Sequence, residues 1–218
     1  MAMTKVTDCT KLKPTAEQLL KAAERLLAEK GLGAVSTREI ARAAGQRNHS
    51  ALHYHFGSQE SLIEAILDYR MMPLNRHRQQ RLDVLRAEGR EADLRSLVEV
   101  IVEPFADELL RPPEDSYYLS LLAQLTSQRN WQPLFTSHQQ RASALLQAGN
   151  LLLALLRPRY GEEVAVERLR LLGLHALNTI TEWDAMRRRG ELTLNSDTLS
   201  WRVTNFIDYL VGGLTAAS

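Results

Sequence analysis

The sequence predicts an all-α protein, and both its composition and its periodicity support this class. Aromatic residues make up 6% of the 218 residues, and Gly and Pro number only 11 and 7. Leu, Ala, Arg and Glu are abundant instead, which favours helices over a β-sandwich or barrel. Apolar residues recur at helical spacing from Pro14 almost to the end of the chain.

Residues 14–57 predict three short helices that form one small core. After a helix over 14–30, Ser36 and Glu39 form a capping box for a second helix over 37–44. Gly45 stands where a helix ends in left-handed geometry, and Asn48 can cap a third helix. The apolar positions that would pack the three together are Leu19, Leu20, Leu27, Ile40, Leu52 and Phe56.

The exposed side of the third helix predicts contact with DNA. It carries polar side chains and almost no aliphatic bulk. Proteins that combine a helix, a tight turn and a second helix with a polar face use this geometry to place side chains in the DNA major groove. A surface helical hairpin with solvated polar residues is the alternative.

The rest of the chain predicts longer helices, at 59–87, 94–110, 114–129, 131–156, 162–189 and 198–214. We expect Pro73 to kink or interrupt the first of these and Pro104 to kink the second, and residues 157–161 to form a turn. The expected organisation is a disordered arm at 1–13, a helix-turn-helix domain at 14–57 and a larger helical domain at 58–218.

The charge distribution supports this division. Residues 1–57 hold nine Lys and Arg against five Asp and Glu, whereas residues 58–218 hold eighteen against twenty-one. A basic module on an acidic body suits a nucleic-acid-facing domain.

The single cysteine, Cys9, excludes an intramolecular disulfide. The longest apolar stretch, 145–156, is too short to span a bilayer, so we expect a cytoplasmic protein without membrane contact.

The last two predicted helices suggest a homodimer. They are apolar over more of their surface than one core can cover, and two helices from each of two subunits would make a four-helix bundle. A larger monomeric core is the alternative. The residues predicted for this interface are Leu169, Leu172, Gly173, Ala176, Ile180, Val203, Phe206, Ile207 and Leu210.

The N-terminal motifs resemble the tetracycline-repressor (TetR) family of transcriptional regulators over about residues 14–67. The resemblance is carried by Ala22-Ala23, Leu26, Lys30-Gly31, Ser36 to Ala41, Ala44-Gly45, Leu52, Tyr54-His55-Phe56, Ser58, Glu60 and Leu62. It implies a three-helix DNA-binding domain on a helical ligand-binding and dimerisation domain. It further implies that dimers bind palindromic double-stranded operator DNA, usually as repressors, and that a small-molecule effector releases the DNA.

The resemblance places the recognition helix at about residues 48–54 and a phosphate contact at Thr37. Two departures stand out, a turn at residues 46–48 that is one residue longer than usual and Gln59 where a lysine is common. The expected readers of base edges are Arg47, Asn48, His49 and Ser50, with Gln46 in the lengthened turn. The expected phosphate and sugar contacts are Thr37, Arg38, His53, Tyr54 and His55.

An effector pocket is expected among the central helices, with an apolar or amphipathic ligand. A ligand there would shift the helix over 59–87 and change the separation of the two half-site readers. The residues expected to line the pocket are Met71, Phe105, Tyr117, Tyr118, Leu122, Leu125, Trp131, Phe135 and His138. An ordinary hydrophobic core is the alternative for each of them.

Metal binding and catalysis are not expected. His53 and His55 lie two apart and point to different sides of a helix, so they cannot share one ion unaided. The acidic residues near Trp183 lack a nucleophile at a suitable spacing. We therefore predict no cofactor and no enzyme activity. The alternative function is a helical small-molecule- or partner-binding protein without specific operator binding.

Overall fold

The computed structural model describes residues 14–46 and 50–217 of the chain. The predicted arm at 1–13 and the predicted base readers Arg47, Asn48 and His49 lie outside the described residues, as does the side chain of Ser50.

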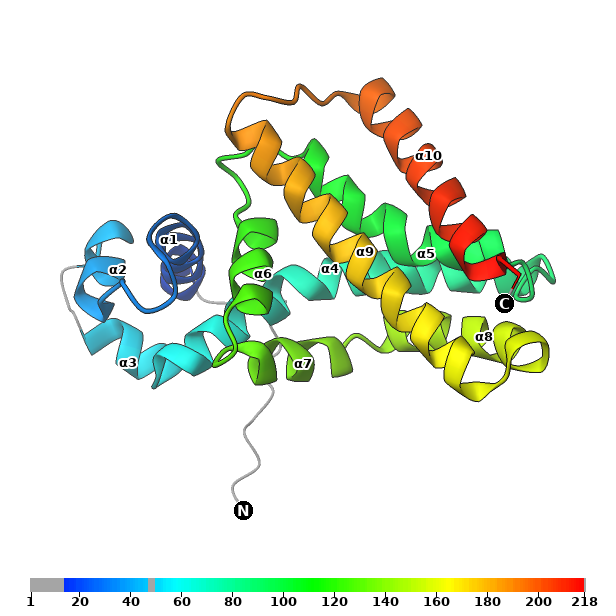
Figure 1. Ribbon diagram of the computed structural model, residues 1–218. Helices are drawn as coiled ribbons and strands as arrows, with labels where there is room; N and C mark the ends of the chain where they lie inside the picture. The colour runs from blue at the N-terminus through cyan, green and yellow to red at the C-terminus, as the bar shows by residue number, and fades with distance from the viewer. Residues whose placement is uncertain (1–13, 47–49, 218) are drawn as a thin grey trace, which may run out of the picture.

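The described residues form helices and no strand, which confirms the all-α prediction (Figure 1). The α-helices are α1 (Pro14–Lys30), α2 (Thr37–Ala43), α3 (Ser50–Phe56), α4 (Gln59–Ala87), α5 (Leu94–Ala106), α6 (Tyr118–Ser127), α7 (Gln132–Gln140), α8 (Ser143–Tyr160), α9 (Glu162–Arg188) and α10 (Ser196–Thr215), and a 3₁₀ helix, η2 (Asp107–Leu110), follows α5. None of them is long and apolar enough to cross a membrane.

Local chemistry sets the bounds of α2. The Ser36 hydroxyl accepts from the Glu39 amide at 3.2 Å, which is one of the two bonds of the predicted capping box, and the Glu39 carboxylate pairs with Lys30. At the other end Gly45 has φ +69°, its amide donates to the Arg42 carbonyl, and the Gln46 amide donates to the Ala41 carbonyl. This pair of bonds is a Schellman motif, so the predicted glycine stop is confirmed.

The chain has no interruption at Pro73 or Pro158, although a kink was the other outcome predicted at Pro73. Helix α4 continues through Pro73, and α8 continues through Pro158 to Tyr160 where a turn was predicted. Buried residues on both sides of Pro73, such as Met71 and Leu74, hold α4 in the core, and this packing outweighs the lost hydrogen bond. Gly161, with φ +81°, ends α8 instead.

Two other predicted helices are also corrected. The helix predicted over 131–156 is divided into α7 and α8 around Arg141 and Ala142. The helix predicted from residue 114 begins only at Tyr118. Arg188 donates to the carbonyls of Pro113 and Ser116, so these groups bond to a side chain rather than within a helix.

Helices α1–α3 lie at one end of the molecule and α4 leads from them into the remaining helices (Figure 1). There α5 packs on α4, α8 and α10, while α9 packs on α6, α8 and α10. Helix α6 lies between α1 and α9 and contacts both. One hydrophobic core is continuous from α1 to α10.

Candidate DNA-binding surface and ligand cavity

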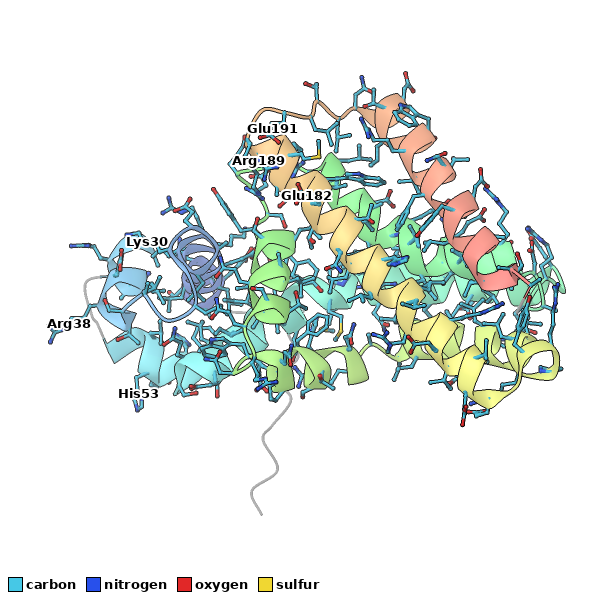
Figure 2. The ribbon with its side chains drawn as sticks, in the orientation of Figure 1. Lys30, Arg38, His53, Glu182, Arg189 and Glu191 are labelled. Atoms are coloured by element: carbon cyan, nitrogen blue, oxygen red, sulfur yellow. The ribbon has the colours of Figure 1, made fainter. Side chains whose placement is uncertain are left out.

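The free side of α2 and α3 forms a polar, exposed surface. Thr37 and Arg38 are exposed in the first turn of α2, and His53 is exposed on α3. Figure 2 shows the labelled Arg38 and His53 pointing away from the rest of the molecule. The Tyr54 side chain is 78% exposed, although tyrosine rings are usually covered at least in part.

Two histidine side chains, those of His53 and His55, make contacts near the end of α3. His53 Nδ1 lies 2.7 Å from the Gly57 carbonyl oxygen. Because a carbonyl can only accept, Nδ1 carries a proton and Nε2 faces outward. The half-buried His55 ring packs edge-on against Tyr54, with 5.2 Å between ring centroids. The surface therefore offers both donors and acceptors.

Two glutamine side chains of this region form hydrogen bonds to other residues of the chain. The Gln46 amide nitrogen donates to Gln18 Oε1 and to the Ala44 carbonyl, both at 3.3 Å. Both hydrogen bonds use the side-chain nitrogen, and the DNA contact predicted for Gln46 stays a prediction. Gln59, where the resemblance expected a phosphate-binding lysine, donates to the Leu32 carbonyl at 2.6 Å. This bond fixes the start of α4 against the loop after α1.

A buried ion pair joins α1 to α4 and to the segment before α6. Glu24 is 1% exposed and accepts from Arg70 Nε at 2.8 Å and from the Tyr117 amide at 2.7 Å. Arg70 also donates to the Asp115 carbonyl. Sequence reasoning missed this joint, although Glu24 follows Leu20 by four residues on the apolar face of α1 and could have been noticed there.

The central helices line a cavity of about 90 Å³ that is partly open to the surface. Of the predicted ligand-binding residues, those that line it are Met71, Phe105, Tyr118, Leu122, Phe135 and His138. Its polar groups include a buried pair in which the Tyr118 hydroxyl lies 3.0 Å from His138 Nε2. The cavity also contains Arg78, which sequence reasoning missed.

The other three predicted residues lie elsewhere. Leu125 is fully buried core, and Trp131 is half-buried at the start of α7. Tyr117 lies at the Glu24 joint, with the Arg188 guanidinium 4.5 Å from its ring centroid.

Most residues predicted for the dimer interface face the core of their own subunit. Those buried there are Leu172, Ala176, Ile180, Val203, Phe206, Ile207 and Leu210. Leu169 is half-buried beside Gly149, and Gly173 and Ala176 line the cavity. The apolar side chains that α9 and α10 expose are different ones, Leu174, Trp201 and Tyr209, at 42%, 55% and 60%. The predicted set therefore lies mostly on the side of α9 and α10 that the subunit itself covers, and the location of a dimer interface stays a prediction.

Residues 19–66 match the family described as bacterial regulatory proteins, tetR family. The N-terminal domain of this chain is therefore of the tetR type. The match covers most of α1, all of α2 and α3, and the first turns of α4.

Solved structures with the same fold span nearly the whole chain. NalD of Pseudomonas aeruginosa, the secondary repressor of the MexAB-OprM multidrug efflux pump, is 22% identical, with 91% of this chain and 96% of NalD covered at a TM-score of 0.60. The fatty acid degradation regulator FadR from Bacillus halodurans is 19% identical, with 95% and 100% covered and a TM-score of 0.57.

The TetR family transcriptional regulator PfmR from Thermus thermophilus is 20% identical, with 95% and 99% covered and a TM-score of 0.56. No curated protein sequence matches the chain. The all-α fold of these structures thus extends over the rest of α4 and over α5–α10, where the family match does not reach.

Proposed function

We propose that this tetR-family chain is a dimeric, sequence-specific DNA-binding regulator, acting as a repressor that a small effector releases from its operator. The observation that carries the proposal is the exposed polar surface of α2 and α3 within the region that matches the family. A gel-shift assay with the DNA upstream of its own gene tests it. A discrete complex that survives excess random DNA is expected, and loss of the complex to the competitor would contradict it.

The proposed division of labour places DNA binding in residues 14–57 and effector binding and dimerisation in residues 58–218. Base reading is assigned to Arg47, Asn48, His49 and Ser50 from the sequence alone. Replacing Asn48 by alanine should relax specificity, since a lost base contact costs about 1–3 kcal/mol.

Arg38→Ala should weaken binding to specific and random DNA alike. The exposed guanidinium at the start of α2 suits a phosphate contact, and losing one such contact lowers the slope of log K against log salt by about one. Fluorescence anisotropy titrations at several salt concentrations measure this slope. Arg159→Ala, at an exposed position on α8 at the other end of the molecule, removes the same charge and should leave the slope unchanged.

The effector is proposed to act through α4 and α6, because each helix reaches both the cavity and the N-terminal helices. Helix α6 lines the cavity with Tyr118 and Leu122, and its Gln124 donates to the Ala28 carbonyl of α1 at 2.6 Å. Helix α4 lines the cavity with Met71 and starts beside the loop after α1. A ligand that displaces either helix would move α2 and α3, and typical coupling between two such sites is about 1–3 kcal/mol.

Dimerisation is proposed through the outer faces of α9 and α10. Leu174 and Tyr209 are exposed there, beside a groove of about 420 Å³ that includes Leu171 and His175. Exposed apolar surface of this kind marks interaction sites.

We expect the double variant Leu174→Glu/Tyr209→Glu to be monomeric in analytical ultracentrifugation at concentrations where the wild type is a dimer. Two carboxylates facing their symmetry copies repel and lose apolar contact. Val84→Glu alters an equally exposed apolar residue of α4 and should remain dimeric. A double variant that keeps the wild-type mass would place the interface elsewhere.

The alternative is a small-molecule- or partner-binding protein of the same fold that no longer reads an operator. It shares the cavity but predicts equal affinity for specific and random DNA. The exposed Arg38, His53 and Tyr54 favour the regulator. The proposal includes no catalytic step, and a DNA-bound regulator would act in the cytoplasm.

A further inference from the structure

Arg78 lies in the wall of the apolar cavity, and it has no acidic partner among residues 14–46 and 50–217. It is 6% exposed and lies on the buried side of α4 with Met71, Leu74 and Leu82. Its Nη2 donates to the Ile101 carbonyl at 3.3 Å, and no atom of the described residues forms a hydrogen bond with its Nε. In the described part of the chain, no Asp or Glu forms an ion pair with it.

A buried guanidinium without a counter-charge lowers the stability of the folded protein unless another group balances its charge. Burial lowers the pKa of Arg78, yet a guanidinium stays protonated at neutral pH because its ordinary pKa is so high. A buried charge without a partner loses its hydration and gains little in return. The folded protein therefore keeps a positive charge at a place where an anion would be strongly favoured.

The neighbouring polar groups do not supply that anion. Burial lowers the pKa of His138, which favours its neutral form. Burial also raises the pKa of Tyr118, so its hydroxyl stays protonated. The nearest carboxylate to His138, that of Asp68, lies 3.9 Å from Nδ1 and accepts from Arg141 at 3.0 Å. The charge of Asp68 is thus already paired with Arg141.

We propose that Arg78 binds the carboxylate of a small organic acid whose hydrocarbon or aryl body fills the rest of the cavity. One guanidinium balances one negative charge and matches the planar geometry of a carboxylate, so a monoanion fits better than a phosphate dianion. Met71, Phe105 and Leu122 provide apolar contacts for the body. The proposal deepens the proposed function, on which it rests for the role of this ligand as the effector.

The cavity also limits the size of the acid. At about 90 Å³, it is smaller than the roughly 150 Å³ cavity that takes up benzene in another protein. A short acid fits with modest displacement of the walls, and that displacement is what would move α4. We therefore choose butyrate, hexanoate and benzoate as probes, each with its primary amide as the uncharged match.

Isothermal titration calorimetry on the full-length protein tests the proposal. For the best of the three skeletons, the wild type should bind the carboxylate at least about tenfold more tightly than the amide, as expected for a charge-assisted bond. Arg78→Met keeps most of the side-chain volume and should reduce this preference to less than about twofold. Arg76→Met removes an exposed charge two residues away on α4 and should keep the wild-type preference.

Thermal melting of the ligand-free variants separates a binding role from a structural one. Arg78→Met should melt at or above the wild-type temperature, because an unpaired buried charge is removed. A lower melting temperature with the carboxylate preference intact would assign Arg78 to its bond with Ile101 and overturn the proposal. Equal binding of acid and amide by the wild type, or binding of neither series, would also overturn it.

Operator binding distinguishes failure of this inference from failure of the proposed function. If a carboxylate binds through Arg78 but the protein shows no specific operator complex, the proposed function fails and the assignment of Arg78 stands. If a specific operator complex forms but acids and amides bind alike, the regulator stands and the assignment of Arg78 fails.

Discussion

Glu24→Ala is expected to lower the free energy of unfolding by about 3–5 kcal/mol, because it leaves the buried Arg70 guanidinium without its carboxylate partner. Glu24 also accepts from the Tyr117 amide, so the substitution leaves a second donor unpaired. Urea denaturation followed by circular dichroism measures the loss. Operator affinity should fall as well, since this ion pair fixes α1 against α4 and the start of α6.

Lys21→Ala is the matched control on α1. Its ion pair with Glu17 is exposed, and such pairs contribute less than about 1 kcal/mol. Similar destabilisation by the two substitutions would mean that the Glu24–Arg70 pair is not the joint between these helices.

Asp184→Ala should have an effect of comparable size at the other side of α6. Asp184 is buried and accepts from Arg187 at 2.7 Å, from Arg188 at 2.8 Å and from Ser120 at 3.0 Å. The two arginines bind carbonyls of the segment between η2 and α6. We expect a loss of about 3–5 kcal/mol in urea denaturation, because both guanidiniums lose their carboxylate.

Glu182→Ala provides the comparison two residues away. Glu182 pairs with Arg189 at the exposed end of α9 (Figure 2), where solvent screens the attraction. The midpoint of urea unfolding of the Glu182→Ala variant should equal that of the wild type. If Asp184→Ala also had no effect, the arginine cluster could not be what holds the segment before α6 in place.

Local signals predicted the N-terminal helices well. The bonds of Ser36 and Gly45 depend on neighbours within a few residues, so their chemistry can be recognised in the sequence. Positions of proline were less informative. Pro158 and Pro73 lie in continuous helices, since tertiary packing decided the outcome there.

The important polar residues of the interior were harder to predict. Periodicity indicates that Glu24 and Arg78 lie on buried faces. It reveals neither the distant partners of Glu24 nor the fact that no acidic residue of the described chain pairs with Arg78. The candidate cavity was located largely correctly because its lining follows the helical phase of α4, α6 and α7. The exposed side of α9 and α10 could not be predicted, because a helix that is apolar on several sides does not reveal which side the subunit itself covers.

The most direct test of sequence-specific operator binding is a selection of random-sequence DNA duplexes by the full-length protein, followed by anisotropy titrations on the enriched duplex and a scrambled one at the same salt concentration. A dimeric regulator should enrich a motif with two-fold symmetry and bind it at least about 10³-fold more tightly than the scrambled duplex. Absence of an enriched motif, or equal affinity for the two duplexes, would contradict the proposed function.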